Sequence, residues 1–197
     1  WYTPTTGIWQ TVWLEPAPAT RILSARVEHD GFTTDPAGAG EVRDPRLVVS
    51  TTAGKGVGVR VTVDAPPTDS ADRVAMLEPD KRPDELTLPL MISPQRLWSP
   101  ASPTMYTALV ELLDEEERVL DSARVSFGLR DIARKPDRAG VNRLMLNGAP
   151  LFQFGPLDQG YWPDGLYTPP TEEAMRFDIE AVKKMGGNML RKHVKVE

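Results

Sequence analysis

The chain has 197 residues, 40% of them hydrophobic, and a formal net charge of -5 at pH 7. This length is enough for one large domain, or for one complete domain with parts of others. The acidic balance argues against a nucleic-acid partner, because no basic face is evident that could neutralise phosphates. No apolar run reaches the roughly 18 residues of a membrane helix, so we expect no membrane partner either.

Cysteine is absent, which excludes disulfides and thiolate chemistry and is compatible with either a cytoplasmic or a secreted protein. The chain begins at Trp1 without a methionine or a leader, and it stops at Glu197 directly after a strand-like run. We therefore expect an internal piece of a longer polypeptide.

Residues 6–15 alternate in a way that predicts one strand with large side chains on both faces. A lone strand is not stable, so this one must pair with a missing sheet or lie against another domain. Two interpretations remain: an aromatic edge strand, or an aromatic platform that stacks on sugars. Pro16 and Pro18 indicate a linker after it.

Residues 22–129 show turn signals between short alternating segments and no helical periodicity. The clearest alternation is Val57, Val59, Val61 and Val63. We predict seven strands, at 22–29, 46–51, 57–64, 73–78, 85–92, 104–113 and 118–129. Seven short strands in this length predict a mainly β fold, a seven-stranded immunoglobulin-like or fibronectin-like sandwich.

The stretch from Leu97 to Leu113 combines a Trp/Pro corner with a long strand. Without a disulfide, a packed core must hold the two sheets together, and we expect Trp98 to be part of it. On that expectation Trp98→Ala costs about 3 to 5 kcal/mol. The acidic run 114–117 could serve acid/base work or a metal only if it converged in a pocket. Consecutive carboxylates in a turn indicate a solvated hairpin tip instead.

After residue 130 a charged, aperiodic crossing segment is expected, followed by a β-hairpin at Asn147-Gly148. A strand at 151–154, a loop, a helix and a strand at 188–194 then predict a βαβ unit with parallel strands. Thr171 should cap the helix, acidic residues fill its first turn and lysines its last, and Gly186-Gly187 end it. Its apolar side chains at helical spacing should pack on a sheet.

Five motifs occur in an order that resembles glycoside hydrolase family 2, the β-galactosidase and β-glucuronidase group. They are Gly7-Ile8-Trp9, Leu97-Trp98-Ser99-Pro100 with Met105-Tyr106-Thr107, Phe127-Gly128-Leu129-Arg130, Asn147-Gly148 and Asn188-Met189-Leu190-Arg191. The resemblance implies a truncated jelly-roll sugar-binding domain over 1–18, an immunoglobulin-like sandwich over 19–131, and the hairpin and first βαβ unit of a truncated (β/α)₈ (TIM) barrel over 132–197. It also implies a retaining enzyme that hydrolyses the O-glycosidic bonds of β-glycosides.

Active sites of such barrels lie at the carboxyl ends of the strands. There the sequence places Asp158 and Trp162 after the first strand, and Arg191 and His193 at the second. We expect Asp158 to lie close to Arg191 and His193, and the four residues to bind the sugar. For His193 a structural role remains an alternative, and for Trp162 ordinary loop packing does.

The resemblance implies two catalytic glutamates, and we expect them downstream of Glu197. No catalytic residue is therefore assigned, no metal or cofactor is expected, and the chain alone should be inactive. Carbohydrate is the expected partner of the whole protein. The alternative is a non-catalytic carbohydrate-binding or adhesive β-sandwich module.

Overall fold

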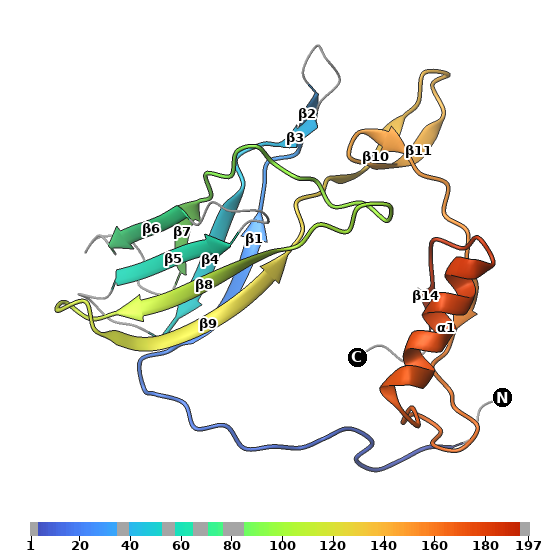
Figure 1. Cartoon of the computed structure of the whole chain (residues 1–197), viewed down its shortest axis with the longest axis horizontal. Helices are drawn as coiled ribbons and strands as arrows, with labels where there is room; N and C mark the ends of the chain where they lie inside the picture. Colours follow the sequence, from blue (N-terminus) through green and yellow to red (C-terminus); the bar gives the residue numbers. More distant parts are fainter. Residues whose placement is uncertain (1–3, 35–39, 53–57, 65–70, 77–84, 194–197) are drawn as a thin grey trace. The chain divides into compact units, whose positions relative to one another are not determined.

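The computed structural model describes residues 4–34, 40–52, 58–64, 71–76 (backbone only) and 85–193. The chain divides into two compact units, one of residues 16–151 and one that combines 1–15 with 152–197. The fold is mainly β, with several small antiparallel sheets and a single helix in the described part (Figure 1).

Two antiparallel sheets form the body of the larger unit. One has the order β1-β4-β7, made of β1 (Ile22–Glu28), β4 (Arg46–Thr51) and β7 (Glu85–Pro89). The other has the order β6-β5-β8-β9, made of β6 (Ala71–Met76), β5 (Gly58–Asp64), β8 (Tyr106–Leu113) and β9 (Val119–Phe127). Each of the seven predicted strands is thus found. Val57 and residues 77–78, at the ends of two of them, lie outside the described residues.

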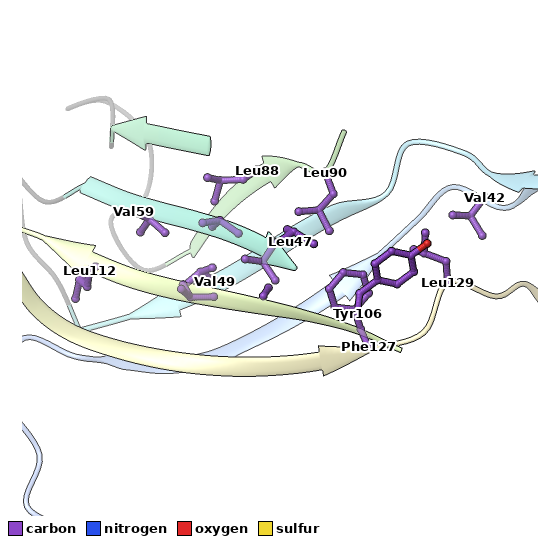
Figure 2. Packing of buried hydrophobic residues seen from close by; sticks show 14 residues of the cluster. Val42, Leu47, Val49, Val59, Leu88, Leu90, Tyr106, Leu112, Phe127 and Leu129 are labelled. Atoms are coloured by element: carbon purple, nitrogen blue, oxygen red, sulfur yellow. The ribbon is translucent and has the colours of Figure 1, made fainter. Parts of the chain in front are cut away.

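Side chains from both sheets pack into one core (Figure 2). Val59, Val61 and Val63 alternate inward along β5, and Ala108 and Val110 do the same along β8. All five are buried because every second side chain of a strand points to the same face. The predicted half-buried alternation of these strands is confirmed.

Tyr106 is the largest side chain in this core and is 1% exposed. Its ring stacks on Phe127, with centroids 5.4 Å apart (Figure 2). Its hydroxyl accepts a hydrogen bond from the backbone N–H of Arg96 at 2.7 Å and donates to the carbonyl of the same residue at 3.3 Å. A buried tyrosine thus connects the corner before β8 to the core.

The expectation that Trp98 lies in the core is wrong. Its neighbour Leu97 packs against the core, and Trp98 itself is only half-buried. The guanidinium of Arg130 lies 4.6 Å from its ring centroid, and a Cβ on Gly128 would be 2.9 Å from the Trp98 Cβ. Because adjacent side chains of an extended segment point to opposite faces, only one of the pair 97 and 98 can face inward.

The acidic run at 114–117 forms the turn between β8 and β9, as predicted. Asp114 accepts hydrogen bonds from the N–H groups of Glu116 and Arg118, and its carboxylate pairs with the Arg118 guanidinium at 2.7 Å. Partial desolvation raises the pKa of Asp114, but these hydrogen bonds outweigh it and leave that pKa below its ordinary value. The carboxylates are therefore a solvated hairpin tip.

Three short elements were not predicted as strands. Strands β2 (Phe32–Thr34) and β3 (Gly40–Val42) pair in a small hairpin, and β10 (Ile132–Pro136) replaces the expected crossing segment. Strand β10 pairs with β11 (Asn142–Leu146) in register from Ile132↔Leu146 to Pro136↔Asn142. Its side chains are mostly exposed, so the sequence carries no apolar alternation to reveal it.

The predicted Asn-Gly hairpin joins β11 to β12 (Ala149–Pro150). Asn147 has φ 50° and Gly148 φ 76°, the positive values that such a turn requires. The Asn147 side chain also accepts from the N–H of Asp131 and donates to the carbonyl of Trp98, both at 3.0 Å. The turn is therefore tied to the end of the sandwich.

The smaller unit contains a parallel strand pair and the helix. Strands β13 (Leu157–Asp158) and β14 (Arg191–Lys192) pair in parallel, and α1 (Glu172–Lys184) connects them. The predicted parallel βαβ arrangement is confirmed, but the strands are two residues long and the first begins later than expected. Phe152, which the prediction placed in the first strand, precedes that strand, and its carbonyl accepts a hydrogen bond from the side chain of Asn188.

The helix has the predicted caps. The Thr171 side chain accepts a hydrogen bond from the N–H of Ala174. Of the predicted apolar face only Val182 is buried, while Met175, Ile179 and Met185 are 42%, 51% and 70% exposed. The described residues supply too short a sheet to cover that face.

The predicted strand over 6–15 is absent, since no strand is assigned within residues 4–18. A strand needs a neighbour to satisfy its backbone groups, and this segment runs without one. Several of its large side chains are exposed, with Ile8 at 83% and Leu14 at 99%.

Candidate functional site

The candidate residues gather at the ends of the parallel pair in the smaller unit. The N–H groups of Arg191 and His193 donate to the carbonyls of Pro156 and Asp158, at 3.0 and 2.9 Å. The segments that lead into the two strands approach closely at Gly155, where a Cβ would lie 1.7 Å from the carbonyl oxygen of Met189. Glycine is therefore required for this pairing.

Asp158 and Lys192 form the charged pair of the site. They are direct partners in the parallel ladder, so their side chains share one face, and Lys192 Nζ lies 2.6 Å from Asp158 Oδ2. The other carboxylate oxygen, Oδ1, accepts from the N–H of Gly160 at 2.8 Å. Asp158 thus fixes the first turn of the loop that follows β13.

Arg191 and His193 lie on the opposite face of β14 from Lys192, because side chains alternate along a strand. The amide Nε2 of Gln159 lies 3.4 Å from His193 Nδ1. Asp158 lies beside Arg191 and His193 along the backbone, as expected, with the His193 N–H bonded to its carbonyl, but its side chain pairs with Lys192 on the opposite face.

The loop from β13 to α1 is held by its own backbone. Trp162 and Leu166 exchange two hydrogen bonds, at 2.8 and 3.1 Å, in a small antiparallel bridge. Leu166 has φ 55°, a left-handed conformation that costs a non-glycine residue on the order of 1–3 kcal/mol. Such strain persists only where the surroundings define the conformation.

A cavity of about 1020 Å³ opens between this loop, α1, β14 and the amino-terminal segment, all within the smaller unit. Its lining includes four aromatic side chains, two carboxylates and one ammonium group: Trp9, Trp13, Trp162, Tyr167, Asp158, Asp178 and Lys192. Apolar walls with a few polar groups are typical of small-molecule sites.

Asp158 and Trp162 of the four predicted residues line this cavity, whereas Arg191 and His193 do not. The sequence prediction missed Lys192, Tyr167 and Asp178. Lys192 lies on the same face of the strand pair as Asp158, but this could be inferred only once the strand register was known. Within the described part of the chain no cluster of three or more His, Cys, Asp or Glu residues could hold a metal ion. Nor does that part contain a helix long and apolar enough to cross a membrane.

The chain combines a β-sandwich, made of a three-stranded and a four-stranded sheet, with a parallel strand-helix-strand unit. Comparison with known proteins assigns this combination to a family. The family model described as glycosyl hydrolases family 2 matches residues 30–130, just over half of the chain. The chain belongs to glycoside hydrolase family 2.

Relatives of this chain include β-glucuronidases. A putative β-glucuronidase of Formosa agariphila is 30% identical over 106 residues, which are 52% of this chain and 9% of that protein. The structure of Bifidobacterium dentium β-glucuronidase in complex with coumarin-3-O-glucuronide has a TM-score of 0.69 at 19% identity, covering 89% of this chain and 27% of that one. For Parabacteroides merdae β-glucuronidase the TM-score is 0.66 at 18% identity, over 89% and 21%. The chain thus spans about a tenth to a quarter of the length of these proteins.

Proposed function

We propose that this chain is part of a retaining glycoside hydrolase that hydrolyses the O-glycosidic bonds of β-glycosides. Family membership and the similarity to β-glucuronidases support this, and so does the parallel pair β13-β14 with its connecting helix. A free-standing carbohydrate-binding module needs no such unit. The unit is proposed to open a (β/α)₈ barrel over 132–197, preceded by the sandwich over 19–131 and by the end of a jelly-roll over 1–18.

The orientation of Arg191 and His193 is the observation that carries the proposal. Leu190 and Lys192 line the cavity together with Met175 and Ile179 of α1, so Arg191 between them, and His193 by the same alternation, face away from the helix. In a (β/α)₈ barrel the helices form the outer ring, and the opposite face of each strand is the interior. Arg191 and His193 would therefore point into the barrel, at the carboxyl end of its second strand.

The four predicted residues take two roles in this proposal. Arg191 and His193 contact sugar hydroxyls or a catalytic carboxylate from the interior. Trp162 contacts the sugar from the loop that follows β13, while Asp158, on the same face of the strand pair as Lys192, holds the start of that loop through the N–H of Gly160. The two carboxylates that act as acid/base and nucleophile in retaining enzymes lie in other parts of the protein, so the chain alone is inactive.

Kinetic measurements on the full-length protein test this. We expect it to hydrolyse a 4-nitrophenyl β-glycoside, with the β-glucuronide as the first probe, and the 197-residue chain to hydrolyse none. Arg191→Ala should lower kcat/KM by about 10²-fold, the effect of losing one donor that stabilises developing charge. Arg176→Ala is the matched control, because Arg176 is an exposed arginine on α1.

Turnover by the isolated chain, or equal kcat/KM for the two arginine variants, would contradict these assignments. Failure of the folded full-length protein to cleave any aryl β-glycoside would contradict the function itself.

A further inference from the structure

The amino-terminal segment and the loop after β13 meet at a cluster of three aromatic side chains. The ring of Trp9 meets the ring of Tyr167 edge-on, with centroids 5.4 Å apart and an interplanar angle of 60°. Tyr167 in turn contacts Tyr161, with ring centroids 5.0 Å and hydroxyl oxygens 3.0 Å apart. The cluster therefore connects Trp9 to both halves of the loop.

A hydrogen bond reinforces this connection. The hydroxyl of Thr168 donates to the backbone carbonyl of Trp9 at 3.0 Å, across 159 positions of the sequence. Thr168 itself is held by a hydrogen bond from its N–H to the carbonyl of Gly165. The contacts of Trp9 thus fall on the returning half of the loop, next to the strained Leu166.

We propose that Trp9 is a positioning residue that holds the loop after β13. Through the loop it also holds the carboxyl end of β13, with Asp158 and the following Gln159. Asp158 is bonded to the N–H of Gly160, where the loop begins, so a displacement of the loop moves the carboxylate. The proposal rests on the proposed function for the nature of the ligand, a sugar. It goes beyond that function by assigning a role to a segment distant in the sequence.

The packing of Trp9 separates this role from that of a free stacking platform. Its ring is half-buried and already contacts Tyr167. Trp13, in the same segment, is 71% exposed and keeps its ring open to solvent. A platform that stacks on sugars needs an open face, whereas a positioning residue needs neighbours.

Hydrogen exchange in the full-length protein tests the structural half of the proposal. Trp9→Ala should increase deuterium uptake in peptides that cover residues 161–168, where the amides of Trp162 and Leu166 bond to each other. Trp9→Phe keeps an aromatic edge against Tyr167 and should restore most of the protection. Leu14→Ala, which removes a 99% exposed side chain of the same segment, should leave uptake in 161–168 unchanged.

Kinetics with a 4-nitrophenyl β-glycoside test the functional half. Trp9→Ala should raise KM by about tenfold and leave kcat within about twofold, because a misplaced loop loses binding contacts rather than the reacting groups. Thr168→Val removes the donor to the Trp9 carbonyl and should change KM in the same direction. Thr168→Ser keeps the donor and should change KM less.

Two results would overturn the proposal. The first is unchanged uptake in 161–168 for folded Trp9→Ala protein. The second is a fall in kcat at constant KM, which would mean that Trp9 only maintains the fraction of folded enzyme. If the full-length protein cleaves no glycoside at all, the proposed function fails, while the exchange experiment still decides whether Trp9 positions the loop.

Discussion

The side chain of Tyr106 combines an apolar ring buried in the core with a hydroxyl that is hydrogen-bonded to the backbone. Its ring lies in an apolar core with 1% exposure, and its hydroxyl reaches the backbone of Arg96. A ring of this size buries on the order of 150–250 Å², which corresponds to roughly 4 to 6 kcal/mol as an upper estimate. Its removal would also leave an N–H group without its acceptor.

Two aromatic truncations therefore differ in cost. Tyr106→Ala should lower the free energy of unfolding by about 3 to 5 kcal/mol, as expected for a fully buried aromatic. Trp98→Ala should lower it by only about 1 to 2 kcal/mol, because the half-buried indole loses a cation-π contact with Arg130 and part of its packing. Urea titrations of the two variants against the parent chain measure the difference. A Trp98 variant that is as destabilised as the Tyr106 variant would return Trp98 to the core.

Among the elements, the parallel pair depends on a glycine that no local pattern demanded. A Cβ at position 155 would overlap the backbone of Met189, which cannot move without separating the strands. A contact with backbone atoms cannot be relieved by a change of side-chain rotamer, so position 155 tolerates no side chain.

Gly155→Ala should open the strand pair. We expect faster hydrogen exchange at the N–H groups of Arg191 and His193, which bond across the pair, with little change in the sandwich. Gly140→Ala is a useful contrast: its φ of 80° adds strain, but no atom lies within 4 Å of the added Cβ. Equal exchange in Gly155→Ala and the parent would show that the strands do not approach as described.

The hairpin of β10 and β11 depends on a carboxylate in its turn. Hydrogen bonds from the N–H of Val141 and from the Arg143 guanidinium hold the pKa of Asp137 below its ordinary value. A lowered pKa in the folded state stabilises the hairpin above the pKa of the unfolded chain. That stability is lost as the pH falls through the lower, folded pKa.

Acid should therefore weaken this turn first below about pH 4, the ordinary pKa of an aspartate. The amide chemical shift of Val141, followed by NMR from pH 6 to 2, should titrate with a midpoint below that value. Asp137→Asn should abolish the titration. A midpoint at or above the ordinary value in the parent chain would contradict the hydrogen bonds described here.

At the scale of the whole molecule, the two units bury very different amounts of apolar surface. The sandwich contains Leu47, Val61 and Val110 at 0% exposure, whereas α1 contributes only Val182 to a buried position. Helices of this length gain most of their stability from packing of the apolar face.

The two units of the 197-residue chain should accordingly differ in local stability. Hydrogen exchange should be slowest in β5 and β8, which are paired on both sides, and much faster in α1. Mass spectrometry of exchange at neutral pH checks this. Protection of α1 equal to that of β8 would mean that the exposed Met175 and Ile179 are covered in solution.

Elements whose signal is local could be predicted from the amino-acid sequence. Alternation of Val59, Val61 and Val63, the Asn147-Gly148 turn and the Thr171 cap each depend on residues within one strand, turn or helix end, and each appeared where predicted. Elements without such a signal were missed, as with β10, whose side chains are exposed on both faces.

Relations between segments distant in the sequence became visible only in the folded chain. The pairing of Asp158 with Lys192 rather than with Arg191, and the contact of Trp9 with Tyr167, both depend on register and on chain path. A shift of one residue in register places a side chain on the opposite face of its strand, and no local pattern specifies that shift.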